Sequence, residues 1–464
     1  MSAVGNIYRD VLWVASKHSQ KWLDSIPFRG VNPKKNANQI KEDLGLDLPD
    51  DPTDPSLVIE RLAEVGEAGL MSMGSGRFFG WVVGGTLPAA LGADWLVSAW
   101  DQNNASRVAT PTTAATEEIA SKWLLEILGL PPTAEVGFPT GGMMANFTGL
   151  ISGRQKVLTD VGWDLDRKGL MGAPHVRVLV GKERHDTVDR ALRYLGLGAP
   201  IEIAVDEQGR IKIDSLRDVL QNGSGPTILC LQAGNLHSGA FDPFKEAIEL
   251  AHAHNAWVHV DGAFGLWALT SPTLRKSLEG VELADSWATD AHKTLNVPYD
   301  CGIAIVAHPE AIRSTYAVNA NYLLLSDDTY GDPSEKVPEF SRRARGVPVW
   351  AALLSLGRNG VTDLVERLVS NARLMAIGLS DIDGCQILND VVFTQVCFAF
   401  ESDERTDEVC ARLIEDKSVW ISGSRWHGRS VLRVSVSNWS TNAEDIEIAV
   451  EAVRKAAREL SNVS

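Results

Sequence analysis

The sequence lacks several features that mark large classes of protein. It has no run long and apolar enough to span a bilayer. Its N-terminus, MSAVGNIYRDVLWV, has no signal-peptide core, because charged residues interrupt the apolar ones. Lysine and arginine are not in excess: the net charge is −16, which disfavours binding to nucleic acid or to an anionic membrane surface. We therefore expect neither nucleic acid nor a membrane as a partner.

Cysteine is scarce and unpatterned. The cysteines are five, an odd number, and no CxxC pair occurs among them, so they predict neither a disulfide framework nor a zinc site. They are typical of buried thiols in a reducing compartment, which indicates a cytoplasmic protein with no bound metal. The positions are Cys230, Cys301, Cys385, Cys397 and Cys410.

Nucleotide-binding motifs are also missing. The chain matches neither the P-loop nor the GxGxxG pattern, which argues against a nucleoside triphosphate or a dinucleotide as ligand. What is present is the composition of a globular protein, with 464 residues, 44% hydrophobic and 22% charged. That length suits one large two-lobed domain or two to three smaller ones.

The chain divides by pattern into three parts. Residues 1–75 are helix-like and polar, which predicts an N-terminal helical segment that clasps a second subunit. Residues 76–345 alternate amphipathic stretches with β-rich runs such as VRVLVG, PTILCLQAG and AWVHVDGAF. This alternation predicts an α/β fold with a parallel sheet wrapped by helices. Residues 346–464 start as a helical pair and continue with β-runs and a last helix, which predicts a small α+β domain.

Four polar residues follow apolar runs and are candidates for a ligand site. Asp261 closes AWVHVD, His185 follows VRVLVGKER, Asn235 follows ILCLQAG and Lys293 follows EGVELADSWAT. Ligands of open α/β sheets bind at the carboxyl ends of strands, so the four together indicate one cleft. Taken singly, each has a plainer interpretation: the aspartate as a helix cap, the histidine as a core residue, the lysine as a loop side chain reaching water.

The stretch FPTGGMMANFTGL at 138–150 places Thr-Gly-Gly before a helix-like sequence. Backbone N–H groups at a helix start can hold a phosphate, and a plain turn is the alternative interpretation. Pyridoxal phosphate is a ligand that needs a phosphate cradle, an acid, a flat stacking partner and one lysine. Its aldehyde reacts with a lysine amine, and an aspartate keeps its pyridine nitrogen protonated.

The motifs HVDGAFG, ADSWATDAHKTLNVPYDCG, ERHDTVDRALRYLGLG and FPTGGMMANF together resemble the group II pyridoxal-phosphate-dependent amino-acid decarboxylases. That family includes the glutamate, aromatic amino-acid and diaminobutyrate decarboxylases. The resemblance runs from about residue 75 to the C-terminus. It implies the aminotransferase-like fold type I, with a mostly parallel seven-stranded sheet in the large domain and a small α+β C-terminal domain. It also implies a lyase of amino-acid metabolism that converts an L-amino acid to an amine and carbon dioxide, as a homodimer with the active site at the interface.

The resemblance implies a role for each matched residue. Lys293 would carry the cofactor covalently, and Asp261 would pair with its pyridine nitrogen. His185 would stack on one face of the ring. The remaining cofactor contacts would come from Gly141, Gly142 and Met143 at the phosphate, His292 beside it, Ala263 against the ring, and Asn235, which stands where relatives often have threonine.

Further residues match the family's substrate side. Arg433, in VLRVSVSNWST, matches an arginine that binds the substrate carboxylate, and a structural salt bridge is the alternative. Phe79 and Trp81, in GRFFGWVVGG, match a segment that meets the substrate side chain. Tyr330 lies in the polar, lid-like loop LLLSDDTYGDPSEKVPEFSRRARG and would donate a proton to the substrate Cα, unless it is only a solvent-facing aromatic.

Two other interpretations stay open from the sequence. The same fold and cofactor serve carbon–carbon lyases or aldolases and oxidative aldehyde synthases. The second of these interpretations, from a different class of protein, is a catalytically silent binding module with this fold. The joint presence of Lys293, Asp261 and His185 argues against such a module, because it would not need all three.

Overall fold

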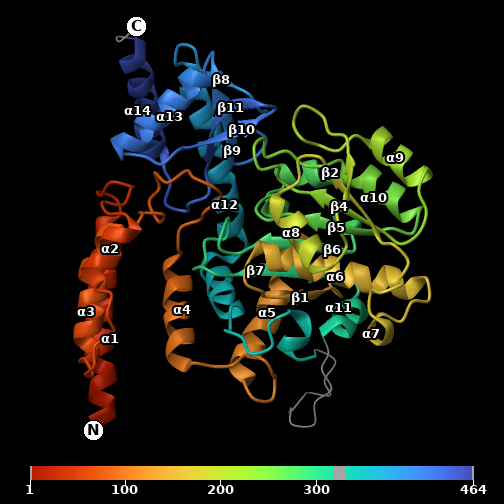
Figure 1. Cartoon of the computed structure of the whole chain (residues 1–464), viewed down its shortest axis with the longest axis horizontal. Coiled ribbons are helices and arrows are strands. Elements are labelled where there is room, and N and C mark those ends of the chain that lie inside the picture. The colour runs from red at the N-terminus through yellow and green to blue at the C-terminus, as the bar shows by residue number, and fades with distance from the viewer. Residues whose placement is uncertain (1–2, 317–330, 462–464) are drawn as a thin grey trace.

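The computed structural model describes residues 3–316 and 331–461. A seven-stranded sheet forms the centre of a large domain, and a four-stranded antiparallel sheet belongs to a small C-terminal domain (Figure 1). These sheets confirm the predicted α/β class with its mostly parallel large sheet and small α+β domain. The helix α12 begins at Gly346, and the predicted boundaries near residues 75 and 345 stay a proposal.

The elements follow one another as helices and strands of very unequal length. The helices are α1 (Ala3–Ser25), α2 (Ala37–Leu44), α3 (Pro55–Gly66), α4 (Pro88–Trp100), α5 (Pro111–Leu128), α6 (Gly142–Asp160), α7 (Leu165–Lys168), α8 (Asp186–Tyr194), α9 (Ile213–Gln221), α10 (Phe244–His252), α11 (Pro309–Tyr316), α12 (Gly346–Ser380), α13 (Asp403–Asp416) and α14 (Ala443–Ser461). The strands are β1 (Glu135–Gly137), β2 (Arg177–Gly181), β3 (Ile201–Ile203), β4 (Thr227–Gln232), β5 (Trp257–Asp261), β6 (Ser286–Asp290), β7 (Gly302–Val306), β8 (Gln386–Ile387), β9 (Gln395–Ala399), β10 (Ser422–Trp426) and β11 (Arg429–Ser435).

The large sheet has the strand order β1-β7-β6-β5-β4-β2-β3. Strands β3, β2, β4, β5 and β6 run parallel, while β7 is antiparallel to both of its neighbours. In register, Gln232 pairs with Asp261 and Asp261 pairs with Ala288, so β4, β5 and β6 finish side by side. The carboxyl ends of these three strands therefore form one edge where side chains can meet.

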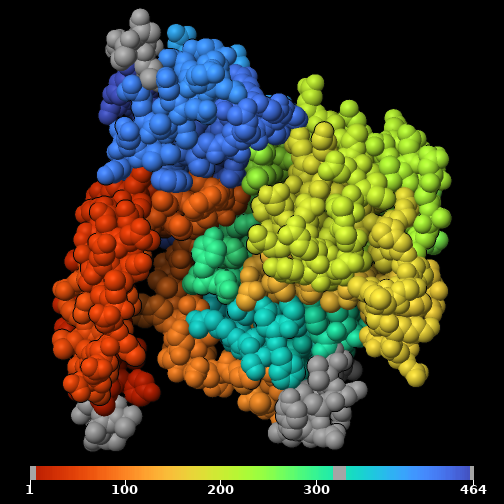
Figure 2. Space-filling view, in the orientation of Figure 1, coloured from red at the N-terminus to blue at the C-terminus, as the bar shows by residue number. Residues whose placement is uncertain are grey.

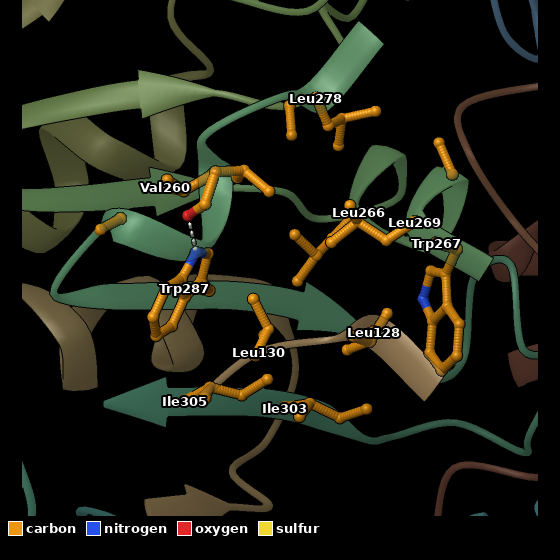
Figure 3. Close-up of a cluster of buried hydrophobic side chains, with 14 of the residues drawn as sticks. Leu128, Leu130, Val260, Leu266, Trp267, Leu269, Leu278, Trp287, Ile303 and Ile305 are labelled. Carbon is orange, nitrogen blue, oxygen red and sulfur yellow. Dashed lines mark hydrogen bonds between the residues drawn. The ribbon is translucent and has the colours of Figure 1, made fainter. Parts of the chain in front are cut away.

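The central strands lie in the largest hydrophobic core of the protein. Every residue of β5, β6 and β7 is buried, as expected for strands covered on both faces. Figure 3 shows part of this core, where Trp267 and Trp287 pack among leucine and isoleucine side chains. The Trp287 Nε1 donates to the Val281 carbonyl at 2.8 Å, so its burial leaves no unsatisfied donor.

The small domain packs its sheet, in the order β10-β11-β9-β8, with α12, α13 and α14 around a second core. The helical pair expected after residue 345 is confirmed, because the backbone of Gly357 is not helical (φ 63°) and divides α12 in two. Glycine tolerates this left-handed conformation, which other residues disfavour.

The N-terminal helices α1, α2 and α3 form a separate column beside α4 (Figure 1, red), and Figure 2 shows that it meets the small domain at one end. A backbone hydrogen bond from the Val31 N–H to the Lys417 carbonyl, 2.9 Å long, ties the segment to that domain. Helices α2 and α3 contain no buried residue. Of the helices within residues 3–316 and 331–461, none combines the length and the apolar character needed to cross a membrane.

Candidate active site

A cavity of about 410 Å³ opens at the carboxyl ends of β4, β5 and β6. The last residues of these strands, Gln232, Asp261 and Asp290, all line it. Lys293 lines the same cavity, so the acid and the lysine singled out in the sequence face one space. Predicted residues in its wall are Lys293, Asp261, His185, Gly142, Met143, Ala263, Arg433 and Trp81.

Lys293 ends in an ion pair. Its Nζ lies 3.0 Å from the Asp290 Oδ2, and the Asp290 side chain is only 2% exposed. The other oxygen of that carboxylate, Oδ1, is buried, has no hydrogen-bond partner among residues 3–316 and 331–461, and lies 3.6 Å from the His292 Nδ1. The Asp290 carboxylate therefore lies between the Lys293 amine and the His292 ring.

Asp261 is a buried carboxyl at the end of β5. Burial raises its pKa, and this effect is opposed by the nearby His185 and Lys293 and by hydrogen bonds from the Ala263 N–H and the Asn146 side chain. The Ala263 nitrogen lies 3.2 Å from the Asp261 Oδ1. The carboxyl is therefore held in one orientation, with cationic groups on the cavity side.

The start of α6 provides the predicted phosphate cradle. Gly141 is the N-cap with a φ of 99°, and the first-turn N–H groups of Gly142 and Met143 have no acceptor within the helix. A Cβ on Gly142 would lie 2.5 Å from the Asp290 Oδ2, and one on Gly141 would lie 3.3 Å from the His292 Cε1. Both glycines are thus required by close packing, and the helix start is favourable for an anion.

His292 and His185 are each fixed by a neighbouring backbone. The His292 Nδ1 lies 3.0 Å from the Cys301 oxygen and 3.2 Å from the Cys301 nitrogen, and its ring contacts the Tyr299 ring at a tilt of 34°, with 4.2 Å between the ring centroids. Burial lowers the pKa of His292. His185 caps α8, and its Nδ1 accepts the Thr187 N–H at 3.2 Å. The His185 ring is therefore oriented at the rim of the cavity.

Arg433 is a buried cation that faces the cavity. Its Nη1 contacts only neutral acceptors, namely the carbonyls of Trp81 and Leu236 and the side chains of Gln395 and Ser435, at 3.0–3.3 Å. No carboxylate forms an ion pair with it in the described part of the chain. Burial lowers the pKa of Arg433 to about 10. The salt-bridge alternative therefore finds no partner there, and an anion in the cavity would satisfy the guanidinium.

Four predicted residues are not part of the cavity wall: Gly141 and His292 directly precede the lining residues Gly142 and Lys293, and Phe79 and Asn235 are engaged elsewhere. Phe79 is fully buried in the core of the small domain, so its prediction as a substrate contact is not supported; its neighbour Trp81 lines the cavity and is 52% exposed. The Asn235 amide is used within its own turn, where its Oδ1 accepts the His237 and Ser238 N–H groups, and its Nδ2 reaches Glu183 at 3.4 Å. Tyr330 lies outside the described residues.

The sequence reasoning missed Asp290, Asn146, Gln232 and Tyr299, which also line the cavity. A signal existed for Asp290, because it is a carboxylate at a strand end three residues before Lys293, as Asp261 is at the end of β5. Asn146 carried no comparable signal, because a lone asparagine within a helix has many roles.

The donor set fits pyridoxal phosphate. The cavity combines an anion-binding helix start, one lysine amine, a buried carboxyl and an aromatic rim at His185. The buried Arg433 guanidinium, which pairs with no carboxylate among the described residues, is complementary to an anionic group of a ligand. A volume of about 410 Å³ lies within the range of small-molecule sites.

Comparison with known proteins agrees with this chemistry. The family model described as the pyridoxal-dependent decarboxylase conserved domain matches residues 37–401. The acidic amino acid decarboxylase GADL1 of Homo sapiens is 26% identical over 370 residues, which are 78% of this chain and 70% of that protein. The matches to the bovine and mouse GADL1 proteins cover 63% and 60% of their lengths.

Two further similarities extend over nearly the whole chain. The aromatic-L-amino-acid decarboxylase of Bacillus atrophaeus is 24% identical over 457 residues, 95% of this chain and 93% of that protein. The crystal structure of Oryza sativa TDC with PLP and tryptamine superposes with a TM-score of 0.91 at 22% identity, covering 99% of both chains. At that identity the structural match establishes the fold.

Proposed function

This chain belongs to the pyridoxal-dependent decarboxylase family, and from that premise we propose that it converts an L-amino acid into the corresponding amine and carbon dioxide. The observation that carries the proposal is one cavity lined by Lys293, Asp261 and Arg433. When bound, pyridoxal phosphate supplies an electron-poor ring that accepts the electron pair left by departing carbon dioxide.

The residues that hold the cofactor are assigned by their chemistry. Lys293 is the attachment point, and Asp290 holds its amine in place beforehand. Asp261 pairs with the pyridine nitrogen, and its carboxylate keeps that nitrogen protonated. The remaining contacts are the N–H groups of Gly142 and Met143 with Gly141 and His292 at the phosphate, and Ala263 and His185 at the ring.

Arg433 is the proposed site for the substrate carboxylate. Its Nη1 is anchored by neutral oxygens, which leaves the rest of the planar guanidinium for an anion in the cavity. Holding that carboxylate in a fixed direction orients the bond that breaks, which is a positional contribution to catalysis. Trp81 lies beside it and is the proposed contact for the substrate side chain.

Tyr330 is the proposed proton donor. Once carbon dioxide has left, the substrate Cα needs a proton, and a phenolic Oη can deliver it. The support is the sequence that surrounds this tyrosine and its position just before Gly331, because Tyr330 lies outside the described residues. Asn235 stays a weaker proposal as a cofactor contact, since its amide is already hydrogen-bonded within its turn.

A homodimer is proposed from the exposed apolar faces of the N-terminal helices. Helices α2 and α3 have no buried residue, and Val14 is the one buried residue of α1 among the described side chains, so the exposed apolar side chains of this segment favour a covering surface. A second copy of this chain is the partner the family resemblance implies. The exposed large apolar side chains on α1, α3 and α4 are Ile7, Tyr8, Leu12, Trp13, Leu23, Leu57, Val58, Leu62, Trp95, Leu96 and Trp100.

The relatives leave the choice of amino acid open. One is named for acidic substrates and another for an aromatic substrate, and their identities to this chain are similar, 26% and 24%. We therefore propose an L-amino acid without choosing its side chain. A cytoplasmic location is proposed from the five unpaired cysteines.

The proposal is tested by a screen of the common amino acids with purified protein and added pyridoxal phosphate. We expect at least one amino acid to yield carbon dioxide and its amine in equal amounts. Lys293→Ala should yield neither, with its fold checked by circular dichroism. Carbon dioxide accompanied by hydrogen peroxide and an aldehyde would indicate the oxidative alternative, and aldehyde without carbon dioxide a carbon–carbon lyase. Silence with every amino acid, with cofactor bound, would contradict decarboxylation.

A further inference from the structure

Behind Asp261, four buried side chains form a hydrogen-bond series that leads away from the cavity. The Trp257 Nε1 donates to the Ser286 Oγ at 2.9 Å, and that oxygen lies 2.8 Å from the His259 Nδ1. The His259 Nε2 lies 2.9 Å from the Asn146 Oδ1, and the Asn146 side chain hydrogen-bonds the Asp261 carboxyl. All four residues are at most 3% exposed, so protein groups rather than solvent satisfy them.

With Asp261 ionised, the hydrogens of this series can be placed in only one way. Tryptophan only donates, so the Ser286 Oγ accepts from it and turns its own hydrogen to the His259 Nδ1. The amide nitrogen of Asn146 must face Asp261, because a carbonyl there would repel the carboxylate. The Asn146 carbonyl then receives the His259 Nε2–H. Burial lowers the pKa of His259 to about 3, so the imidazole is neutral with its single proton on Nε2. Each donor along the series therefore points toward Asp261.

Helix α6 is shaped to admit the series. Gly142, Asn146, Gly149 and Gly153 follow at helical spacing along one face of α6. A Cβ on Gly149 would lie 2.4 Å from the His259 Nδ1, and one on Gly153 would lie 2.7 Å from the Trp257 Cδ1. The helix that provides the anion-binding start thus also provides, one turn later, the amide that reaches Asp261.

Other groups around Asp261 act on its charge as well. Burial disfavours the carboxylate, while His185 and Lys293 lower the pKa of Asp261 from the cavity side. Cys230 on β4 lies close enough that Asp261 raises its pKa. A small adjoining space is lined by Asp261 together with Cys230, Glu183, Arg184 and Asp242. Of the two hydrogen bonds that Asp261 accepts, one comes from the Ala263 backbone and the other from the Asn146 side chain. The orientation of the Asn146 amide depends in turn on His259.

We propose that Asn146 and His259 are positioning residues that hold Asp261 as an oriented carboxylate, while Ser286 and Trp257 fix the tautomer of His259. An amide side chain can turn by 180°, and the His259 Nε2–H holds the Asn146 oxygen on the side away from Asp261. With His259 in place, a turned Asn146 would set two donors against each other and an oxygen against the carboxylate. The inference rests on the proposed pairing of Asp261 with the pyridine nitrogen.

The test is the dissociation constant of pyridoxal phosphate for the cofactor-free protein, measured from pH 5 to 9 by quenching of tryptophan fluorescence. Binding requires the carboxylate, so affinity falls as pH falls through the pKa of Asp261. In Asn146→Leu and His259→Leu we expect the pH at which affinity falls to be higher by about one unit. At a pH on the falling part of the profile, the dissociation constant would then be about tenfold larger. His259→Gln, whose amide can donate at the position of Nε2, should return the profile toward that of the unmodified protein.

Controls separate this inference from a general packing effect and from the proposed function. Ser152→Ala removes a buried hydroxyl from α6 outside the series, where it donates to the Thr148 carbonyl, and should keep the profile. Asp261→Asn should abolish the acid-side fall. If Asp261→Asn keeps it, the pairing with the cofactor is wrong. Suppose instead that Asp261→Asn abolishes the acid-side fall. The positioning role is then overturned if Asn146→Leu and His259→Leu keep the profile of the unmodified protein, or if they weaken binding equally at every pH. Should Asn146→Leu fail to fold, Ser286→Ala must shift the profile in the same direction.

Discussion

Arg433 is the residue whose surroundings say most about the substrate. It is buried at the cavity wall, its contacts are neutral oxygens, and no carboxylate pairs with it within the described residues. A guanidinium in such a place is favourable only when an anion completes it.

Replacing Arg433 by lysine should lower kcat/KM by about 10- to 150-fold, because a hydrogen bond to a charged group is worth about 1.5–3 kcal/mol and lysine lacks the planar fork. Steady-state kinetics measure this, and the dissociation constant of the cofactor should stay unchanged. The control is Arg429→Lys on the same strand, where the side chain donates to the Phe400 carbonyl away from the cavity. Equal losses in both variants would contradict a direct contact with substrate.

At this scale the sequence was informative where a residue type carries its chemistry visibly. Lys293, Asp261, His185 and Arg433 all line the cavity, as expected from residues that end strands or carry an inward charge. Phe79 lies in the core of the small domain instead, because the chain turns between it and Trp81, whose φ is 49°, and the sequence alone does not say which of the two aromatics faces the cavity. Asn146 and His259 were not predictable, since their roles depend on contacts between distant segments.

Among the elements, strand β6 is held at both of its ends by polar contacts. Its carboxyl end carries Asp290 at the cavity. Just before its other end, Asp285 accepts from His252 at 3.0 Å and from His308 at 2.9 Å, and it joins α10 and the loop before α11 to the sheet. The hydrogen bond with Asp285 raises the pKa of His308.

His308→Gln should reduce stability more at low pH than at high pH. The raised pKa means that the folded state favours the protonated ring, so this contribution is complete below the unfolded pKa of 6.5 and is lost as pH rises through the folded one. Urea denaturation should give a deficit about 0.5 kcal/mol larger at pH 5.5 than at pH 8.5, the scale of a half-exposed pair. His254→Gln, whose ring contacts a backbone carbonyl, is the control. A deficit independent of pH would refute the charge effect.

Helices and strands long enough to show a repeating pattern of hydrophobic residues could be predicted from the sequence, and shorter elements could not. The runs around β2, β4 and β5 and the helical pair of α12 were recognised from pattern. Strands β1 and β3 have three residues each and β8 has two, which is too short for an alternation to be visible. Their pairing is decided by the neighbouring strands rather than by local sequence.

At the scale of the whole molecule, the N-terminal helices α1, α2 and α3 are the part of the chain with many apolar side chains exposed. Helices α1 and α3 expose apolar residues, and the partner that we propose to cover them is a second copy of this chain.

We expect light scattering to give twice the chain mass of 50.3 kDa. Leu12→Asp should shift the protein toward the monomer, because it places a charge on the exposed apolar face of α1. Met171→Asp, at a highly exposed apolar residue of the large domain, should leave the dimer intact. A fully active monomer at micromolar concentration would exclude the proposed assembly.

The proposed decarboxylase activity requires Lys293 to be the covalent attachment point of the cofactor. The most direct measurement is to load the protein with pyridoxal phosphate, reduce the link with borohydride, and locate the added mass by peptide sequencing in a mass spectrometer. We expect a single modified residue, Lys293, and loss of that modification in Lys293→Ala. Modification of a different lysine, or none in a protein that binds the cofactor, would contradict the proposal.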